Sequence, residues 1–180
     1  MKNIKLVTAG IILSFFTLLS SQENGDLAEV ELLSSMSQQQ AQFQLNAIFG
    51  SVAPTAEYDI SVYRIEYHTI DPLGEPTVAS GSIAFPQDPQ TAFPILSYQH
   101  GTEVLRDDVS SVYGFDAINM WLSATGFITV SPDYLGLGIS EMLHPYIINI
   151  PTATAVAHFL IASKTFCDDM DDLQYNDQLF

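Results

Sequence analysis

Two uninterrupted apolar runs, Phe93 to Leu96 and Phe127 to Val130, constrain the fold of this chain most. Neither run alternates apolar and polar residues, as a strand with one solvent-exposed face would. Both runs therefore predict strands covered by helices on both faces. Between the runs, apolar residues recur every three or four positions from Phe115 to Leu122, and Gly126 provides a stop signal for a helix. A strand, helix, strand order of this kind indicates a parallel sheet.

An antiparallel hairpin is predicted ahead of these runs. Tyr63, Ile65 and Tyr67 alternate with polar residues, which is the period of a half-buried strand. The sequence DPLGEP at residues 71–76 is typical of a turn, and residues 77–85 form a second strand that ends at a proline. The first half of the sheet is therefore expected to be antiparallel.

The two ends of the chain give weaker patterns. After Pro151, Thr152 or Thr154 could cap a helix, and its apolar residues share one stripe: Ala155, Val156, Phe159, Leu160 and Phe166. Residues 22–56 are rich in Ser, Gln and Ala and only loosely periodic, so we expect an irregular lead-in with a short helix or two. Residues 57–180 are expected to form the folded domain.

The first 21 residues have the pattern of a secretory signal peptide. Lys2 and Lys5 precede an apolar stretch from Leu6 to Leu19, which small residues follow. The stretch is short for a membrane span, so a stable membrane anchor is the weaker interpretation. We therefore expect an exported protein, either secreted or periplasmic, and exclude residues 1–21 from the fold.

Charge argues against nucleic acid as a partner. The formal net charge is −16, and beyond residue 21 only Arg64, Arg106 and Lys164 balance 21 acidic residues. Such a chain is repelled by nucleic acid and by anionic lipid. We interpret the acidity as a solubility feature of an exported protein.

No cofactor or metal site is predicted. Cys167 is the single cysteine, which excludes an internal disulfide and a cysteine-based zinc cluster. A Cys167 nucleophile paired with His158 is conceivable, but the aspartates that follow would disfavour the thiolate. The sequence DDMDD at residues 168–172 lacks the ligand spacing of a calcium loop and is interpreted as a solvated turn.

A nucleotide site is also disfavoured. Gly136 and Gly138 begin a Gly-x-Gly-x-x-Gly pattern, but Glu141 occupies its third glycine position and would oppose a pyrophosphate.

Two loops follow the two apolar strands, QHGTEV from residue 99 and PDYLGLGIS from residue 132. Sheets of parallel strands bind ligands beyond the carboxyl ends of their strands. We therefore expect the functional site at these two loops.

The loops and their surroundings resemble a known family. The stretches YDISVYRIEYHTIDPLGEPTVASGSIAFP, PILSYQHGTEV and ITVSPDYLGLGISEMLHPY are similar to the first half of exported lipase and esterase-like members of the α/β-hydrolase superfamily. The resemblance covers roughly residues 55–180. It implies the N-terminal half of an α/β-hydrolase fold, with an antiparallel hairpin leading into a parallel sheet that carries helices on both faces. It also implies a serine carboxylic-ester hydrolase with a small-molecule or lipid ester as substrate.

The resemblance also assigns site residues. Gly101 and Thr102 would offer backbone N–H groups to the oxyanion, and His100 would shape that loop, because the family's base comes late in the chain. The alternative is that Gly101 only satisfies a tight turn. Asp133, Tyr134 and His144 would shape the neighbouring loops, with Asp133 bracing backbone rather than acting as the catalytic acid.

The motif that carries the family's nucleophile does not occur in these 180 residues, since no Gly-x-Ser-x-Gly is present. The sequence QLF at residues 178–180 has the pattern of a strand just starting, and in the family the next strand leads into the nucleophile. We therefore expect the N-terminal part of a longer hydrolase, with nucleophile, acid and base outside this chain and no activity of its own. The alternatives are a non-catalytic exported binding module, and a peptidase or acetyl esterase of the same fold.

Overall fold

The computed structural model describes residues 22–180, so the predicted signal peptide lies outside the described residues. Helices and strands follow one another in this order: β1 (Leu27–Met36), α1 (Gln38–Phe49), the short 3-10 helix η1 (Gly50–Val52), β2 (Ile60–Ile70), β3 (Pro76–Pro86), β4 (Ala92–Ser97), α2 (Ser110–Tyr113), α3 (Ala117–Ala124), β5 (Ile128–Pro132), α4 (Asn149–Asp169) and β6 (Gln174–Leu179).

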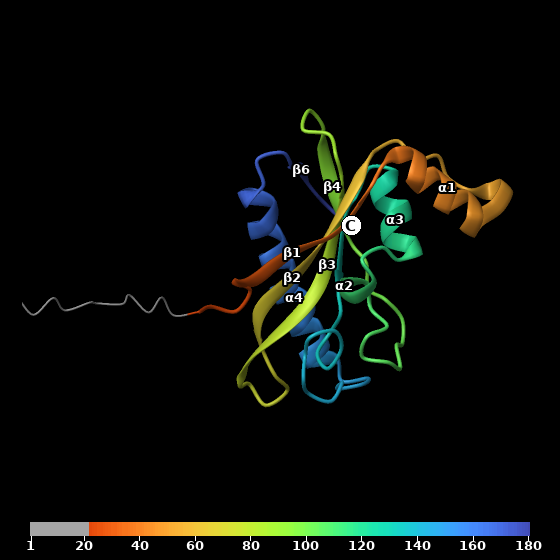
Figure 1. Cartoon of the computed structure of the whole chain (residues 1–180). Coiled ribbons are helices and arrows are strands. Elements are labelled where there is room, and N and C mark those ends of the chain that lie inside the picture. Colours follow the sequence, from red (N-terminus) through yellow and green to blue (C-terminus); the bar gives the residue numbers. More distant parts are fainter. Residues whose placement is uncertain (1–21) are drawn as a thin grey trace, which may run out of the picture.

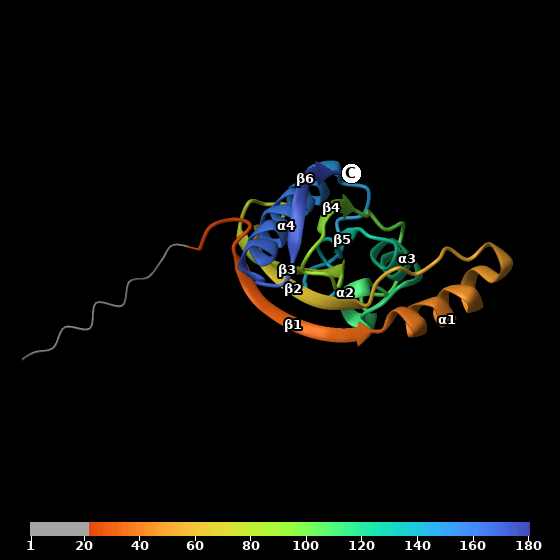
Figure 2. The ribbon, with the colours of Figure 1, turned by 90° about the horizontal axis from the view of Figure 1, so that it is seen from above.

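All six strands form one mixed sheet (Figure 1), and its order, β1-β2-β3-β5-β4-β6, can be followed from above in Figure 2. The pairs β1–β2, β2–β3 and β3–β5 are antiparallel, whereas β4 pairs parallel with both β5 and β6. The predicted hairpin and the predicted parallel half are therefore confirmed.

Helices cover both faces of the sheet, as the two apolar runs predict. Figures 1 and 2 show α4 on one face and α1, α2 and α3 on the other. The main core lies under α4, where Phe159 and Phe166 pack on buried residues of β2, β3 and β5. A smaller core lies between α1 and α3, around Leu45 and Met120.

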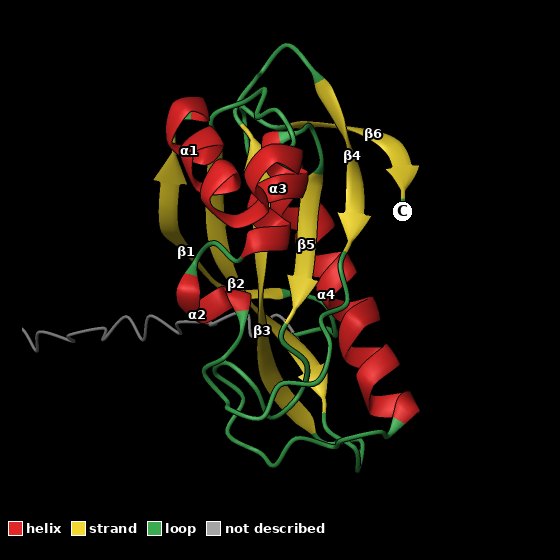
Figure 3. Cartoon of the chain, turned by 90° about the vertical axis from the view of Figure 1, so that its right-hand side faces the viewer, coloured by secondary structure: helices red, strands yellow, loops and turns green. Residues whose placement is uncertain are grey.

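The direction of the strand connections changes at β4. The chain passes from β4 through α3 on one face to β5, and from β5 through α4 on the other face to β6, so β4 lies between the two strands that follow it (Figure 3). A crevice at the carboxyl ends of the strands is expected at such a switch point. The loops after β4 and β5 lie at this edge.

The expected irregular lead-in over residues 22–56 is wrong in its first half. Residues Leu27–Met36 form β1, which pairs with β2 and belongs to the same sheet as the rest of the chain. This strand lies at the edge of the sheet, most of its side chains are exposed, and two register shifts interrupt its pairing. Its alternation is therefore weak in the sequence. The expected helix is present as α1, which begins at a Ser37–Gln40 capping box.

The last helix starts earlier than Thr152 or Thr154 would place it. Helix α4 begins at Asn149, and its N-cap Ile148 provides no side-chain hydrogen bond. Pro151 therefore lies within the first turn, where no backbone N–H is required. The Thr152 hydroxyl donates to the Ile148 carbonyl, 3.0 Å away, instead of capping the helix. None of the helices among residues 22–180 is long and apolar enough to cross a membrane.

Candidate functional site

The loops after β4 and β5 meet at the carboxyl edge of the sheet. The His100 ring nitrogen Nε2 lies 3.3 Å from the carbonyl oxygen of Asp133, and the Tyr134 hydroxyl donates to the His100 carbonyl over 3.3 Å. The structure thus brings the residues of the two predicted loops together.

Four rings follow one another along this edge. The His100 and Tyr134 rings are 4.4 Å apart between centroids, Tyr134 and His144 are 6.5 Å apart, and His144 and Tyr146 are 6.1 Å apart. The His144 nitrogen Nδ1 lies 2.7 Å from the Leu135 carbonyl oxygen, which fixes the His144 ring to the loop after β5.

A pocket of about 790 Å³ opens beside these rings. The two loops contribute its polar side, and the first half of α4 contributes an apolar wall: Ala153, Val156, Ala157 and Leu160. The hydroxyls of Thr102 and Tyr146 lie 3.2 Å apart and connect the two loops next to the pocket. Its volume lies within the range of small-molecule sites.

Gly101 and Thr102 line this pocket, and both are exposed. Within residues 22–180, neither N–H makes a backbone–backbone hydrogen bond outside regular helices and strands. Gly101 does not have the positive φ of a tight turn, and no atom of residues 22–180 beyond its chain neighbours lies within 4 Å of the place where a Cβ would stand. The open space above Gly101 would allow a ligand to approach the main chain closely.

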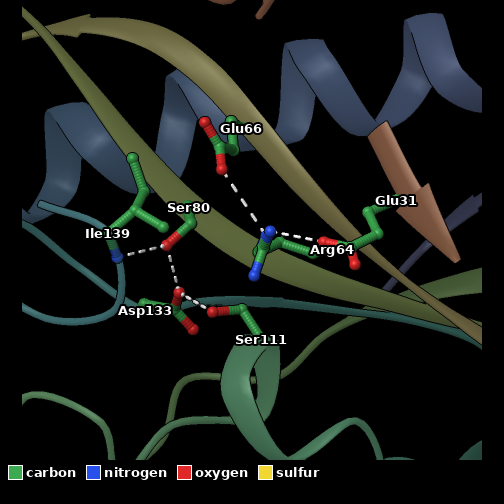
Figure 4. A network of polar contacts seen from close by, with 7 residues as sticks. All are labelled: Glu31, Arg64, Glu66, Ser80, Ser111, Asp133 and Ile139. Carbon is green, nitrogen blue, oxygen red and sulfur yellow. Dashed lines mark hydrogen bonds and ion pairs between the residues drawn. The ribbon is translucent and has the colours of Figure 1, made fainter. Parts of the chain in front are cut away.

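Asp133 is not among the pocket-lining residues, and its carboxyl belongs to a network of polar contacts with Ser80 and Ser111 (Figure 4). Its carboxylate is fully buried, and it accepts hydrogen bonds from the hydroxyls of Ser80, at 2.5 Å, and Ser111. The Ile139 N–H in turn donates to the Ser80 hydroxyl over 3.2 Å. Burial raises the pKa of Asp133, against the opposing effect of the two hydroxyl donors. This arrangement suits a brace for the loop after β5.

Left-handed backbone shapes that loop. Tyr134 has a φ of 68°, and Gly136 and Gly138 have φ values of 80° and 58°. A Cβ at Gly136 would lie 2.3 Å from the His144 backbone nitrogen, and one at Gly138 would lie 2.4 Å from Asp133 Oδ2. The two glycines are therefore required by close packing, which explains the spacing that resembled a nucleotide-binding turn.

Sequence reasoning missed several residues of this region. Ser80 and Ser111 are separated from Asp133 by 53 and 22 positions, and no local pattern connects them to it. Tyr146 was also missed, although it follows His144 and Pro145 directly. The apolar wall of the pocket was predictable, because Val156 and Leu160 belong to the apolar stripe predicted for α4.

The other polar candidates lie apart from the pocket. His158 Nδ1 is 2.8 Å from the Thr69 hydroxyl on β2. The His158 ring is therefore paired with Thr69 rather than with Cys167. Burial raises the pKa of the Cys167 thiol to about 12, which disfavours a thiolate. Among the described residues, no group of three or more His, Cys, Asp or Glu side chains is arranged to hold a metal ion.

Solved structures share the fold of this chain. A provisionally assigned hydrolase from Legionella pneumophila is 34% identical, with a TM-score of 0.76 over 85% of this chain and 42% of its own length. The ligand-bound form of the rice cell wall degrading esterase LipA from Xanthomonas oryzae is 25% identical, with a TM-score of 0.74 over 87% of this chain and 41% of its own. Lipase A from Candida antarctica, at 15% identity and a TM-score of 0.50, shares the fold over 81% of this chain. No family model and no curated protein sequence matches the chain.

The mixed sheet, its switch point and these neighbours define an α/β-hydrolase, and the chain belongs to that superfamily. It is similar to esterase and lipase structures and has part of their fold, spanning about two fifths of the length of the first two.

Proposed function

We propose that this chain supplies the oxyanion-stabilising half of the active site of an exported serine esterase. The observation that carries the proposal is the exposed Gly101–Thr102 backbone beside the pocket at the carboxyl ends of β4 and β5. The esterase and lipase neighbours support an ester as the substrate class.

The chemistry of ester cleavage requires such a group. Attack on an ester carbonyl places a negative charge on its oxygen, and preorganised backbone N–H donors stabilise this charge more than they stabilise the uncharged ester. The N–H groups of Gly101 and Thr102 are the donors in this proposal. The apolar α4 wall would hold an alkyl part of the ester against Val156 and Leu160.

The proposal places the nucleophile, acid and base outside these 180 residues. No Gly-x-Ser-x-Gly occurs in the sequence, and an oxyanion site without a nucleophile has nothing to activate. The chain alone should neither cleave a short aryl ester nor react with a fluorophosphonate probe. Serine-dependent labelling of the chain alone would overturn this part of the proposal.

A chimera tests the positive part. Residues 22–180 are joined to the part of LipA that has no counterpart in this chain, and kcat/KM is measured on a short-chain aryl ester. Thr102→Pro removes one N–H donor, and we expect kcat to fall about 10²- to 10³-fold, as for other oxyanion donors. Thr102→Ser keeps that N–H and should retain activity. An active chimera in which Thr102→Pro has no effect would exclude Thr102 as an oxyanion donor.

A further inference from the structure

The His100 ring lies between two backbone carbonyl oxygens. Its Nδ1 is 2.8 Å from the oxygen of Gly101, and its Nε2 is 3.3 Å from the oxygen of Asp133. A carbonyl oxygen only accepts hydrogen bonds, so each ring nitrogen must donate. A neutral imidazole has a single N–H, and therefore only the imidazolium cation makes both bonds.

The surroundings of the ring suit a cation. The ring lies against the ring of Tyr134, at 4.4 Å between centroids, and an aromatic ring is a favourable neighbour for a cation. A second cavity of about 250 Å³ shares His100 with the pocket, and within the described part of the chain no Lys or Arg lines either cavity. The titratable side chains that line the two cavities beside His100 are Tyr98, Glu103, Asp108, Tyr113, Asp116, Tyr134, His144 and Tyr146.

We propose that protonated His100 is a positioning residue that clamps the loop after β4 to the end of β5. One ring N–H holds the Gly101 carbonyl within the loop, and the other holds the Asp133 carbonyl on the neighbouring loop. When His100 loses its proton, one of these carbonyls loses its donor, and the Gly101–Thr102 segment is less firmly held. The clamp therefore holds while His100 is protonated and opens when that proton is lost.

The clamp deepens the proposed function and rests on it only for its consequence. If Gly101 and Thr102 bind the oxyanion, opening the clamp displaces their N–H donors. The rate of hydrolysis then depends on pH through the position of these donors. The hydrogen bonds themselves can be measured without any catalysis. Failure of the clamp and failure of the esterase proposal are therefore separate results.

Nitrogen-15 NMR of the uniformly labelled chain is the decisive measurement. We expect both ring nitrogens of His100 to carry a proton at acidic pH, because each lies against a carbonyl acceptor. As the pH rises, one proton should leave, and the Gly101 and Thr102 amide resonances should shift with the same midpoint. A single protonated ring nitrogen at every pH where the chain is folded would overturn the proposal, and this result needs no variant.

Three variants separate the clamp from a general effect of pH. His100→Gln, which cannot carry a charge, should abolish the pH step in the Gly101 and Thr102 amides. His100→Lys keeps a cation with several donors and should hold those amides near their acidic positions at about pH 8. His68→Gln, on β2, is the matched control and should leave the step intact. An unchanged step in His100→Gln would show that another group controls this loop.

Discussion

At the scale of single residues, the most unusual group is the buried carboxyl of Asp133. It is held by two serine hydroxyls, and among residues 22–180 its Oδ1 oxygen has no hydrogen-bond partner. Burial is the largest effect on this group and raises its pKa above the ordinary 3.8. The folded state therefore favours the protonated carboxyl relative to the unfolded state.

The raised pKa fixes the sign of a pH dependence. The stabilising contribution of Asp133 is fully present below pH 3.8 and is lost as the pH rises through its folded pKa, because the unfolded chain ionises first. Asp133→Asn cannot ionise and should lack this loss. Urea unfolding of both proteins between about pH 4 and pH 8 should show the wild type losing stability relative to the variant as the pH rises. A constant difference across this range would contradict the assignment.

At the scale of elements, α4 packs across one face of the sheet and also forms the apolar wall of the pocket. Phe159 is fully buried, and its ring lies 5.2 Å from that of Tyr67 on β2. A Cβ at Gly81 of β3 would stand 2.5 Å from the Phe159 ring, so the glycine provides the space for this ring. The Tyr67 hydroxyl also donates to the Ala155 carbonyl over 3.0 Å, and this hydrogen bond attaches α4 to β2.

Removing this ring should strongly destabilise the chain. We expect Phe159→Ala to lower the free energy of unfolding by about 3–5 kcal/mol, since it removes buried surface and leaves a cavity. The control is Phe43→Ala on α1, where the side chain is 72% exposed and the change should stay within about 0.5 kcal/mol. Urea unfolding followed by circular dichroism measures both, and equal shifts would show that α4 is not packed as described.

The elements differ in how well the sequence predicts them. Strands β2, β3 and β5 and helix α3 were predictable, because each has a buried face or an apolar run with clear turn signals at its ends. Strand β1 was not, because an exposed edge strand with bulges has no regular alternation. The start of α4 was misplaced because Ile148 is a helix N-cap without a capping side chain.

At the scale of the whole molecule, the site depends on contacts that join distant segments. The two loops were predictable, since each follows an apolar strand whose carboxyl end must lie at one edge of a parallel sheet. The support beneath them was not, because Ser80 on β3 and Ser111 on α2 reach Asp133 only once the sheet has formed. Sequence patterns therefore located the site, whereas its bracing follows from the fold.

The open edge of the sheet determines how the whole molecule should behave in solution. Strand β6 is an edge strand, and Leu179 and Phe180 at its end are 60% and 64% exposed. A groove of about 450 Å³ between β6 and α4 is lined partly by apolar side chains, including Ile95, Leu160 and Leu179. Unpaired backbone beside exposed apolar surface favours pairing with another chain.

We therefore expect the chain to associate as its concentration rises, in spite of its large negative charge. Leu179→Lys places a charge at the edge and should lower the apparent mass at a given concentration, as measured by sedimentation or light scattering. The control is Leu73→Lys, in the turn between β2 and β3, where the leucine is 86% exposed but lies far from this edge in the sheet. If both variants reduce association equally, the effect does not depend on the β6 edge. Repulsion between whole molecules does not explain it either, because an added lysine lowers the net negative charge and weakens that repulsion. A selective effect of Leu179→Lys would locate the contact at β6, because only that substitution puts a charge beside the unpaired strand.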